Sequence, residues 1–138
     1  MKLFSVLLIA IVLPLAGCAG MNSGAGVARD FEDVPRIYIV FFAVDSSELD
    51  EAARGVIAEA ARDSMRFQPT TIQIAGFSGD GPESTVSPAL AEGRFSAVAN
   101  ALAAEGLDPS LIARSELVDD PDLPEIAEQR IEIHFELP

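Results

Sequence analysis

The sequence predicts an α/β (α+β) domain, a two-layer sandwich in which two helices pack on a mixed four-stranded sheet. Three observations carry this prediction: four apolar or alternating stretches suited to strands, two apolar stripes at helical spacing between them, and turn residues at the junctions. The expected order along the chain is β-α-β-α-β-β. Residues 36–138 are enough for one domain with a single core.

The first strand is expected from Arg36 to Val44. Its nearly continuous run of β-branched and aromatic side chains is typical of a central strand covered on both faces. A helix is expected next, from about Asp50 to Arg66, with Asp50 among the candidate caps. The apolar stripe of this helix consists of Ala53, Val56, Ile57, Ala60 and Ala61.

Alternation from Thr70 to Phe77 predicts a second strand with one buried face. A loop rich in glycine follows, and then Ser87 and Pro88 provide an N-cap and a proline for the first turn of a second helix. Gly106 is suited to a left-handed conformation just past the end of this helix. One side of the helix holds Leu90, Arg94, Val98, Ala101 and Leu102.

Two closing strands are expected at Leu111 to Val118 and at Arg130 to Leu137. The segment between them, Asp119 to Glu128, is acidic and contains prolines, so it is expected to be a loop.

The N-terminal residues predict the cellular compartment. A positive start is followed by an apolar run from Leu3 to Leu15, too short for a comfortable membrane span. The next residues, Ala16-Gly17-Cys18, complete a stretch that resembles the lipobox of bacterial lipoproteins. We therefore expect residues 1–17 to be a cleaved signal peptide and residues 18–35 to be a lipidated cysteine followed by a flexible tether. Because Ala19 is not aspartate, the resemblance implies the outer membrane, with residues 36–138 folded in the periplasm.

Composition excludes several classes of function. The formal net charge of −13 repels phosphate backbones, so we expect no nucleic-acid partner. Cys18 is the only cysteine, which leaves no intramolecular disulfide. The single histidine, His134, comes without a Gly-x-Ser-x-Gly motif or a cluster of metal ligands. We therefore expect no enzyme activity, no cofactor and no metal site.

Arg94 is the candidate binding residue, because a guanidinium inside an apolar stripe needs a partner. In one interpretation the side chain reaches solvent or forms an internal ion pair with Asp80 or Glu83. In the other it anchors a carboxylate, while Asp80 in the neighbouring loop takes the amine of the same zwitterionic ligand.

The segment from Arg36 to Leu137 resembles the OmpA-like domain, of the type found in peptidoglycan-associated lipoproteins. The matching stretches are Val40–Leu49, Ile74–Ser78, Leu90–Arg94 and Arg130–Ile133. This resemblance implies a peptidoglycan-binding module whose second loop and helix bind the diaminopimelate stem, with Arg94 taking a carboxylate.

The resemblance also locates the other candidate site residues. The family's asparagine falls on Ser87 and its ligand-binding aspartate on Gly79, with Asp80 one place later. Arg130 matches the second arginine of the closing strand, and Gln129 replaces the first. The predicted peptidoglycan-binding set is Ser78, Asp80, Ser87, Leu90, Arg94 and Arg130.

Two functions follow from these features. The first is an outer-membrane lipoprotein that binds peptidoglycan and tethers the membrane to the cell wall. The alternative is a degenerate OmpA-like domain that binds proteins of an envelope complex, an interpretation favoured by Gly79 and by the acidic surface.

Overall fold

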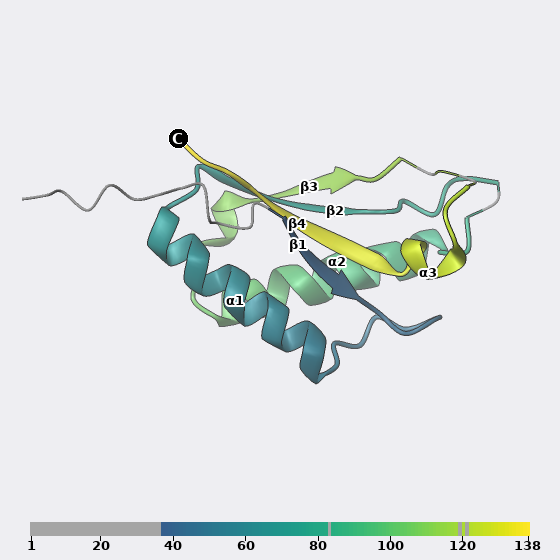
Figure 1. The fold of residues 1–138 in the computed structure, drawn as a ribbon, viewed down its shortest axis with the longest axis horizontal. Helices are drawn as coiled ribbons and strands as arrows, with labels where there is room; N and C mark the ends of the chain where they lie inside the picture. The colour runs from purple at the N-terminus through teal and green to yellow at the C-terminus, as the bar shows by residue number, and fades with distance from the viewer. Residues whose placement is uncertain (1–36, 83, 119, 121) are drawn as a thin grey trace, which may run out of the picture.

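A computed structural model describes residues 37–82, 84–118, 120 and 122–138 (Figure 1). The fold has the predicted order of strands and main helices, which confirms the α+β sandwich. The principal elements are β1 (Ile37–Phe41), α1 (Glu51–Phe67), β2 (Thr71–Gly76), α2 (Pro88–Ala104), β3 (Ile112–Glu116) and β4 (Arg130–Glu136). A 3-10 turn, η2 (Pro109–Leu111), precedes β3, and a one-turn helix, α3 (Glu125–Glu128), lies within the segment expected to be a loop.

The sheet has the strand order β1-β4-β2-β3. Strand β4 pairs antiparallel with both β1 and β2, whereas β2 and β3 are parallel. The last strand of the fold therefore lies between the first two. Both long helices cover the same face of this sheet, as Figure 1 shows.

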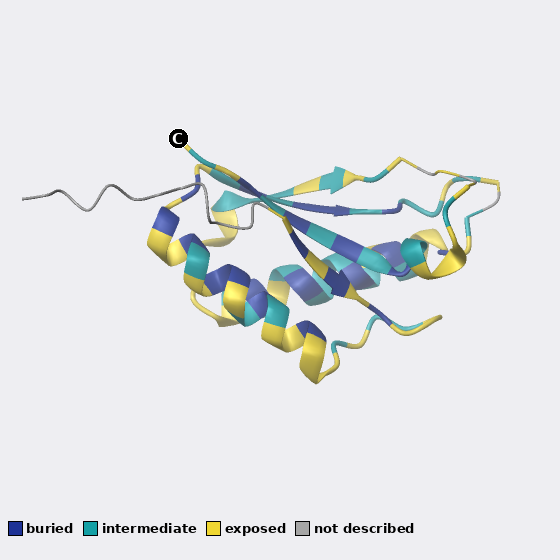
Figure 2. Ribbon diagram, viewed as in Figure 1, coloured by how far each residue is buried: buried dark blue, intermediate teal, exposed yellow. Residues whose placement is uncertain are grey.

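The position of β1 corrects the sequence analysis, which expected a central strand covered on both faces. The strand is at the edge of the sheet, and Ile37, Ile39 and Phe41 are 48%, 43% and 51% exposed. The intervening Tyr38 and Val40 face the helices and are buried, so exposed and buried residues alternate along β1 (Figure 2). The apolar run is continuous because the residues on the open face of β1 are also apolar, although no helix covers that face.

The helices begin at the predicted caps. The Asp50 carboxylate accepts a hydrogen bond from the Ala53 amide at 2.7 Å, and the Ser87 hydroxyl accepts one from the Leu90 amide at 3.2 Å. Gly106 has a φ of 99° just beyond α2, as expected for a left-handed C-terminal turn. Among the described residues, no helix combines the length and apolar character needed to cross a membrane.

The core forms where the two helices meet the covered face of the sheet. Strand β4 contributes Ile131, Ile133 and Phe135, which are central because β4 has a neighbour on each side. Both α1 and α2 pack small and branched side chains against them. These helix residues are Ala53, Ile57, Ala60, Ala61, Val98 and Leu102.

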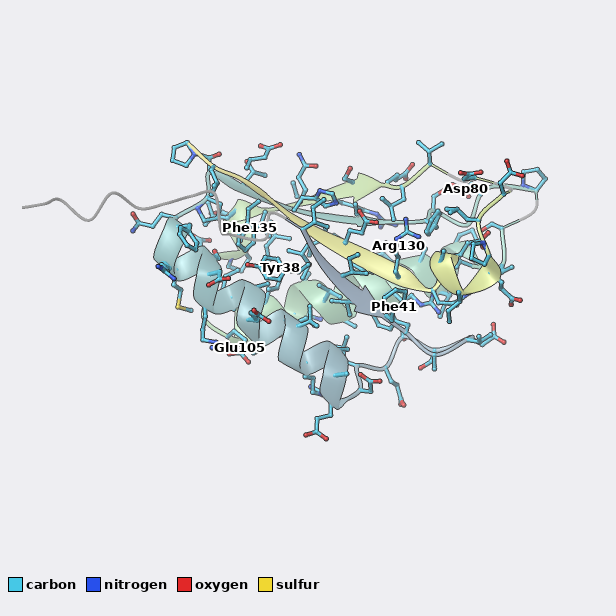
Figure 3. The ribbon with its side chains drawn as sticks, in the orientation of Figure 1. Tyr38, Phe41, Asp80, Glu105, Arg130 and Phe135 are labelled. Atoms are coloured by element: carbon cyan, nitrogen blue, oxygen red, sulfur yellow. The ribbon has the colours of Figure 1, made fainter. Side chains whose placement is uncertain are left out.

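Tyr38 ties the edge strand to the first helix. Its hydroxyl donates a hydrogen bond to the Asp63 carboxylate at 2.6 Å, and its ring lies 5.3 Å from that of Phe135 (Figure 3). Burial and the neighbouring Asp63 carboxylate raise the pKa of Tyr38 above its ordinary value. The phenol therefore stays protonated and keeps donating at neutral pH.

The open face of β4 carries a ladder of charged side chains. Glu132 accepts from Arg130 Nε at 2.7 Å and lies 2.9 Å from His134 Nε2. Burial alone would raise the pKa of Glu132, but the hydrogen bonds from Arg130 and His134 hold it below its ordinary value. The Glu132 carboxylate is therefore stabilised in its charged form by folding.

Replacing Tyr38 with Phe tests the link between β1 and α1. The variant keeps the aromatic packing and loses one hydrogen bond, so its free energy of unfolding should fall by about 1 kcal/mol. Urea unfolding of the Tyr38→Phe variant and of the parent chain measures this difference. An unchanged free energy would show that the contact with Asp63 contributes nothing to stability.

Replacing Glu132 with Gln tests the charged ladder and its pH dependence. Because folding lowers the pKa of Glu132, its contribution is present above the unfolded pKa of about 4.3 and is lost as the pH falls through the folded pKa. We expect Glu132→Gln to be less stable than the parent by about 1 kcal/mol at pH 7, and we expect this difference to be smaller at pH 3, below the unfolded pKa. Urea unfolding at both pH values measures this, with Glu116→Gln on exposed β3 as the charge-matched control.

Candidate functional site

The site is built around Arg94 on α2. Ser87 and Pro88 start this helix, which places Arg94 in its second turn on the side facing the core. The residue is only 2% exposed and shares its helix face with Ala91 and Val98. The helix therefore directs a guanidinium into the protein instead of toward water.

The guanidinium spans three segments of the chain. Its Nε donates to the Ser46 carbonyl at 2.9 Å, and its Nη2 donates to the Ala43 carbonyl at 3.1 Å and to Gln129 Oε1 at 2.6 Å. The Cζ atom of the guanidinium lies over the ring of Phe42, 5.1 Å from the ring centroid. Arg94 thus connects α2 to the loop after β1 and to the residue before β4.

The remaining nitrogen, Arg94 Nη1, is buried and has no hydrogen-bond partner in the described part of the chain. A buried donor left unpaired costs about 1–3 kcal/mol, so the environment favours an acceptor at this position. Burial lowers the pKa of Arg94 from its ordinary value, and the nearby Asp45 carboxylate opposes that shift. Arginine keeps its proton at physiological pH despite such a shift, so the buried group is a cation with one free donor.

The loop after β1 presents its carbonyls to Arg94 through a tight turn. Asp45 adopts a left-handed φ of 56°, a conformation that aspartate tolerates better than most residues. The Ser46 amide bonds back to the Ala43 carbonyl at 3.1 Å. This turn directs two carbonyls toward the same guanidinium.

Gln129 is the site residue that the sequence analysis missed. It is 1% exposed, accepts from Arg94, and donates from Nε2 to Thr85 Oγ1 at 3.2 Å. The sequence analysis treated it only as a replacement for an arginine. Its position immediately before an alternating apolar strand was a signal, because a side chain there lies at the edge of the core.

The two loops near the site are tied together beside Gln129. The Glu128 carboxylate accepts from the Thr85 amide at 2.8 Å and from the Thr85 hydroxyl at 2.6 Å. Thr85 belongs to the loop before α2, and Glu128 closes α3. These bonds fix α3 and the loop before α2 next to the buried guanidinium.

The structure places the other predicted site residues apart from Arg94. Asp80 is exposed in the loop after β2, where its amide lies 3.4 Å from Ser78 Oγ (Figure 3). No hydrogen bond or ion pair joins Asp80 to Arg94 in the described structure, so the internal ion pair between them is not formed.

The remaining members of the predicted set have structural contacts of their own. Ser87 caps α2, and Leu90 in its first turn is half-buried. Arg130 binds Glu132 on the open face of the sheet and lies over the ring of Phe77 at 5.1 Å. Glu83 and Cys18 lie outside the described residues.

Gly79 occupies the position at which the resemblance places an aspartate. Its φ is 78°, in the left-handed region that favours glycine. A Cβ there would lie 2.4 Å from the Val86 carbonyl oxygen and 2.7 Å from the Pro88 nitrogen. The backbone therefore has no room for a side chain at this position.

The site contains hydrogen-bond donors and one buried cation but no ligand set for a metal. Nowhere in the described segments do three or more histidine, cysteine, aspartate or glutamate side chains gather closely enough to hold a metal ion. The chemistry that the arrangement supports is the binding of an acceptor, most directly a carboxylate, by a guanidinium.

Comparison with solved structures places the fold among known domains. The OmpA-like domain of FopA1 from Francisella tularensis superposes with a TM-score of 0.59 at 19% identity, covering 74% of this chain and 75% of that one. The peptidoglycan-associated lipoprotein from Burkholderia pseudomallei superposes with a TM-score of 0.57 at 18% identity, covering 72% and 90%. The cell wall anchor of the T6SS from Pseudomonas aeruginosa gives 0.55 at 14% identity, covering 74% and 81%.

These identities establish the fold alone, and no curated protein sequence matches this chain. The model of the OmpA family, in contrast, matches residues 41–128, which is more than half of the sequence. The match extends from the end of β1 to the end of α3 and includes Arg94 with its loops. The chain therefore belongs to the OmpA family.

Proposed function

We propose that this protein is an outer-membrane lipoprotein that binds peptidoglycan non-covalently and tethers the membrane to the cell wall. The observation that carries the proposal is the buried Nη1 of Arg94, which has no hydrogen-bond partner among the described residues. A ligand carboxylate is the acceptor that a guanidinium binds best, because two parallel N–H bonds match its two oxygens. The carboxylate of a diaminopimelate stem supplies such a group.

Access to Arg94 requires movement of the loops that cover it. Arg94 is 2% exposed, and its Nη2 already donates a hydrogen bond to Gln129 Oε1 at 2.6 Å. An incoming carboxylate would replace the Gln129 amide oxygen and also satisfy Nη1. The exchange is favourable because a charged acceptor forms a stronger bond with a guanidinium than a neutral amide does.

Asp80 would take the amine of the same ligand. It is exposed, and it lies between Gly79 and Gly81 in the loop that precedes α2. Glycines on both sides let the backbone adopt conformations closed to other residues, so the loop can move its carboxylate toward a bound stem.

The membrane anchor in this proposal is Cys18, within the stretch Leu15-Ala16-Gly17-Cys18. Residues 18–35 would act as the tether between the lipid and the domain, with a reach of at most about 3.3 Å per residue. Two of the similar structures carry corresponding names, one a peptidoglycan-associated lipoprotein and the other a cell wall anchor.

A second candidate function is a protein-interaction module of an envelope complex. Two observations favour it: Gly79 has no room for a ligand-binding side chain, and Arg94 already has three protein acceptors. In that case Arg94 would be a structural residue, and the domain would not bind the cell wall.

Sedimentation with purified diaminopimelate-type sacculi distinguishes the two functions. The full chain, extracted in detergent, should sediment with sacculi, and Arg94→Met and Asp80→Asn should each weaken binding about tenfold or more, because a bond to a charged group contributes roughly 1.5–3 kcal/mol. Arg114→Met is the control, since it removes the same charge from an exposed arginine paired with Glu92.

Asp80→Asn is the decisive variant, because it changes an exposed side chain and leaves the Arg94 contacts intact. If the parent chain stays in the supernatant, wall tethering is wrong and the interaction module replaces it. If the parent binds and Asp80→Asn binds equally well, the proposed role of Asp80 in taking the amine is wrong.

Glycine substitutions test whether the site tolerates a side chain at the family's aspartate position. Gly79→Ala should lower the free energy of unfolding by about 2 kcal/mol or more, because of its positive φ and the close backbone of residues 86–88. Gly55→Ala, on α1 with open space around it, should instead raise it by about 0.5–1 kcal/mol. Urea unfolding measures both, and a stable Gly79→Ala variant would show that the loop adapts.

A further inference from the structure

In the described structure, the outer edge of β1 has peptide groups without a strand partner and exposed apolar side chains, and both belong to the same residues. The Phe42 amide bonds to the Gln129 carbonyl at 2.8 Å, and this bond sets the phase of the antiparallel ladder between β1 and β4. Alternate residues of an antiparallel strand bond to the same neighbour, so Tyr38, Val40 and Phe42 bond toward β4. The peptide groups of the residues between them therefore point away from the sheet.

Those outward-directed residues are Ile37, Ile39 and Phe41, the three exposed apolar side chains of β1. Strand β1 pairs only with β4 in the described structure. Within the described residues, the edge thus presents a row of free backbone donors and acceptors together with the exposed apolar side chains of the same residues, of which Phe41 is labelled in Figure 3.

This edge lacks the features that normally prevent strand pairing. Soluble proteins protect edge strands with charges, prolines or bulges, and the five residues of β1 (IYIVF) contain none of these. The opposite edge, β3, does carry charges, at Arg114 and Glu116. The contrast between the two edges indicates that β1 is suited to a partner strand.

The distribution of charge favours β1 as the place where two copies of the chain can approach each other. Its formal net charge of −13 disfavours contact between copies over most of the surface. Strand β1 carries no charge, and beside it on β4 the charges of Arg130 and Glu132 neutralise each other. Two copies therefore meet with little repulsion at this edge.

We propose that a second copy of this chain covers the edge, with the two β1 strands paired antiparallel about a two-fold axis at Ile39. In this register Ile39 lies opposite the partner's Ile39, and Ile37 lies opposite the partner's Phe41. All the free peptide groups of these residues are then paired, and their side chains form one continuous apolar row across the interface. The product is an eight-stranded sheet with β3 at each end.

Cysteine substitutions test the register directly. In the proposed dimer the two residues at position 39 have Cα atoms about 5.5 Å apart, which is within the range for a disulfide. The two residues at position 41 are about 14 Å apart, four residues along the strand and one strand across, which is outside it. Ile39→Cys should therefore form a covalent dimer under mild oxidation of the full chain in detergent.

Phe41→Cys is the matched control and should remain mostly uncrosslinked, as should the parent chain, whose only cysteine is Cys18. Mixing Ile37→Cys with Phe41→Cys chains should restore crosslinking, because these positions are opposite each other. Equal crosslinking of Ile39→Cys and Phe41→Cys would overturn the proposed register.

A charge placed on the edge tests the dimer without a crosslink. The parent chain should sediment as a dimer that dissociates on dilution, and Ile39→Lys should sediment as a monomer at every concentration. Ser115→Lys, on the opposite edge strand, should stay dimeric. A monomeric parent chain would overturn the proposal, including the case in which residues before β1 cover the edge. Sacculus binding by such a monomer would leave the proposed function intact, because Arg94 does not lie on this edge.

Discussion

The guanidinium of Arg94 is the contact that holds together the end of the domain formed by α2, the loop after β1 and the start of β4. It holds α2, the loop after β1 and the residue before β4 in one arrangement. A buried cation without acceptors costs several kcal/mol, so the two loop carbonyls and the Gln129 amide are required for this packing to be stable. In the proposed function a ligand carboxylate would compete for these same donors, which would couple its binding to the conformation of the surrounding loops.

Gln129 shows how the support of the site extends beyond Arg94. Its amide oxygen accepts a hydrogen bond from the guanidinium, while its amide nitrogen donates one to the Thr85 hydroxyl in the loop before α2. Glu128 binds that threonine a second time through its carboxylate. Two neighbouring residues at the end of α3, Glu128 and Gln129, thus both bind Thr85 and fix the loop before α2 relative to the start of β4.

Sequence patterns predicted the helices well and the site only in part. Asp50 and Ser87 marked the starts of α1 and α2, because capping is a local interaction between neighbours in sequence. The place of β1 in the sheet was predicted wrongly, since an apolar run looks the same in a central strand and in an edge strand whose open face is apolar. The contact between Arg94 and Gln129 joins residues 35 positions apart, and no local pattern encodes it.

The place of β4 between β1 and β2 has a consequence for the order in which the domain can fold. Strand β4 is the neighbour that β1 and β2 share, so β1 has no strand partner in the described sheet without residues 130–136. Only the parallel pair of β2 and β3 can form in their absence. The complete sheet therefore depends on pairing between segments far apart in the chain, a topology whose loop-closure entropy slows folding relative to sheets built from adjacent hairpins.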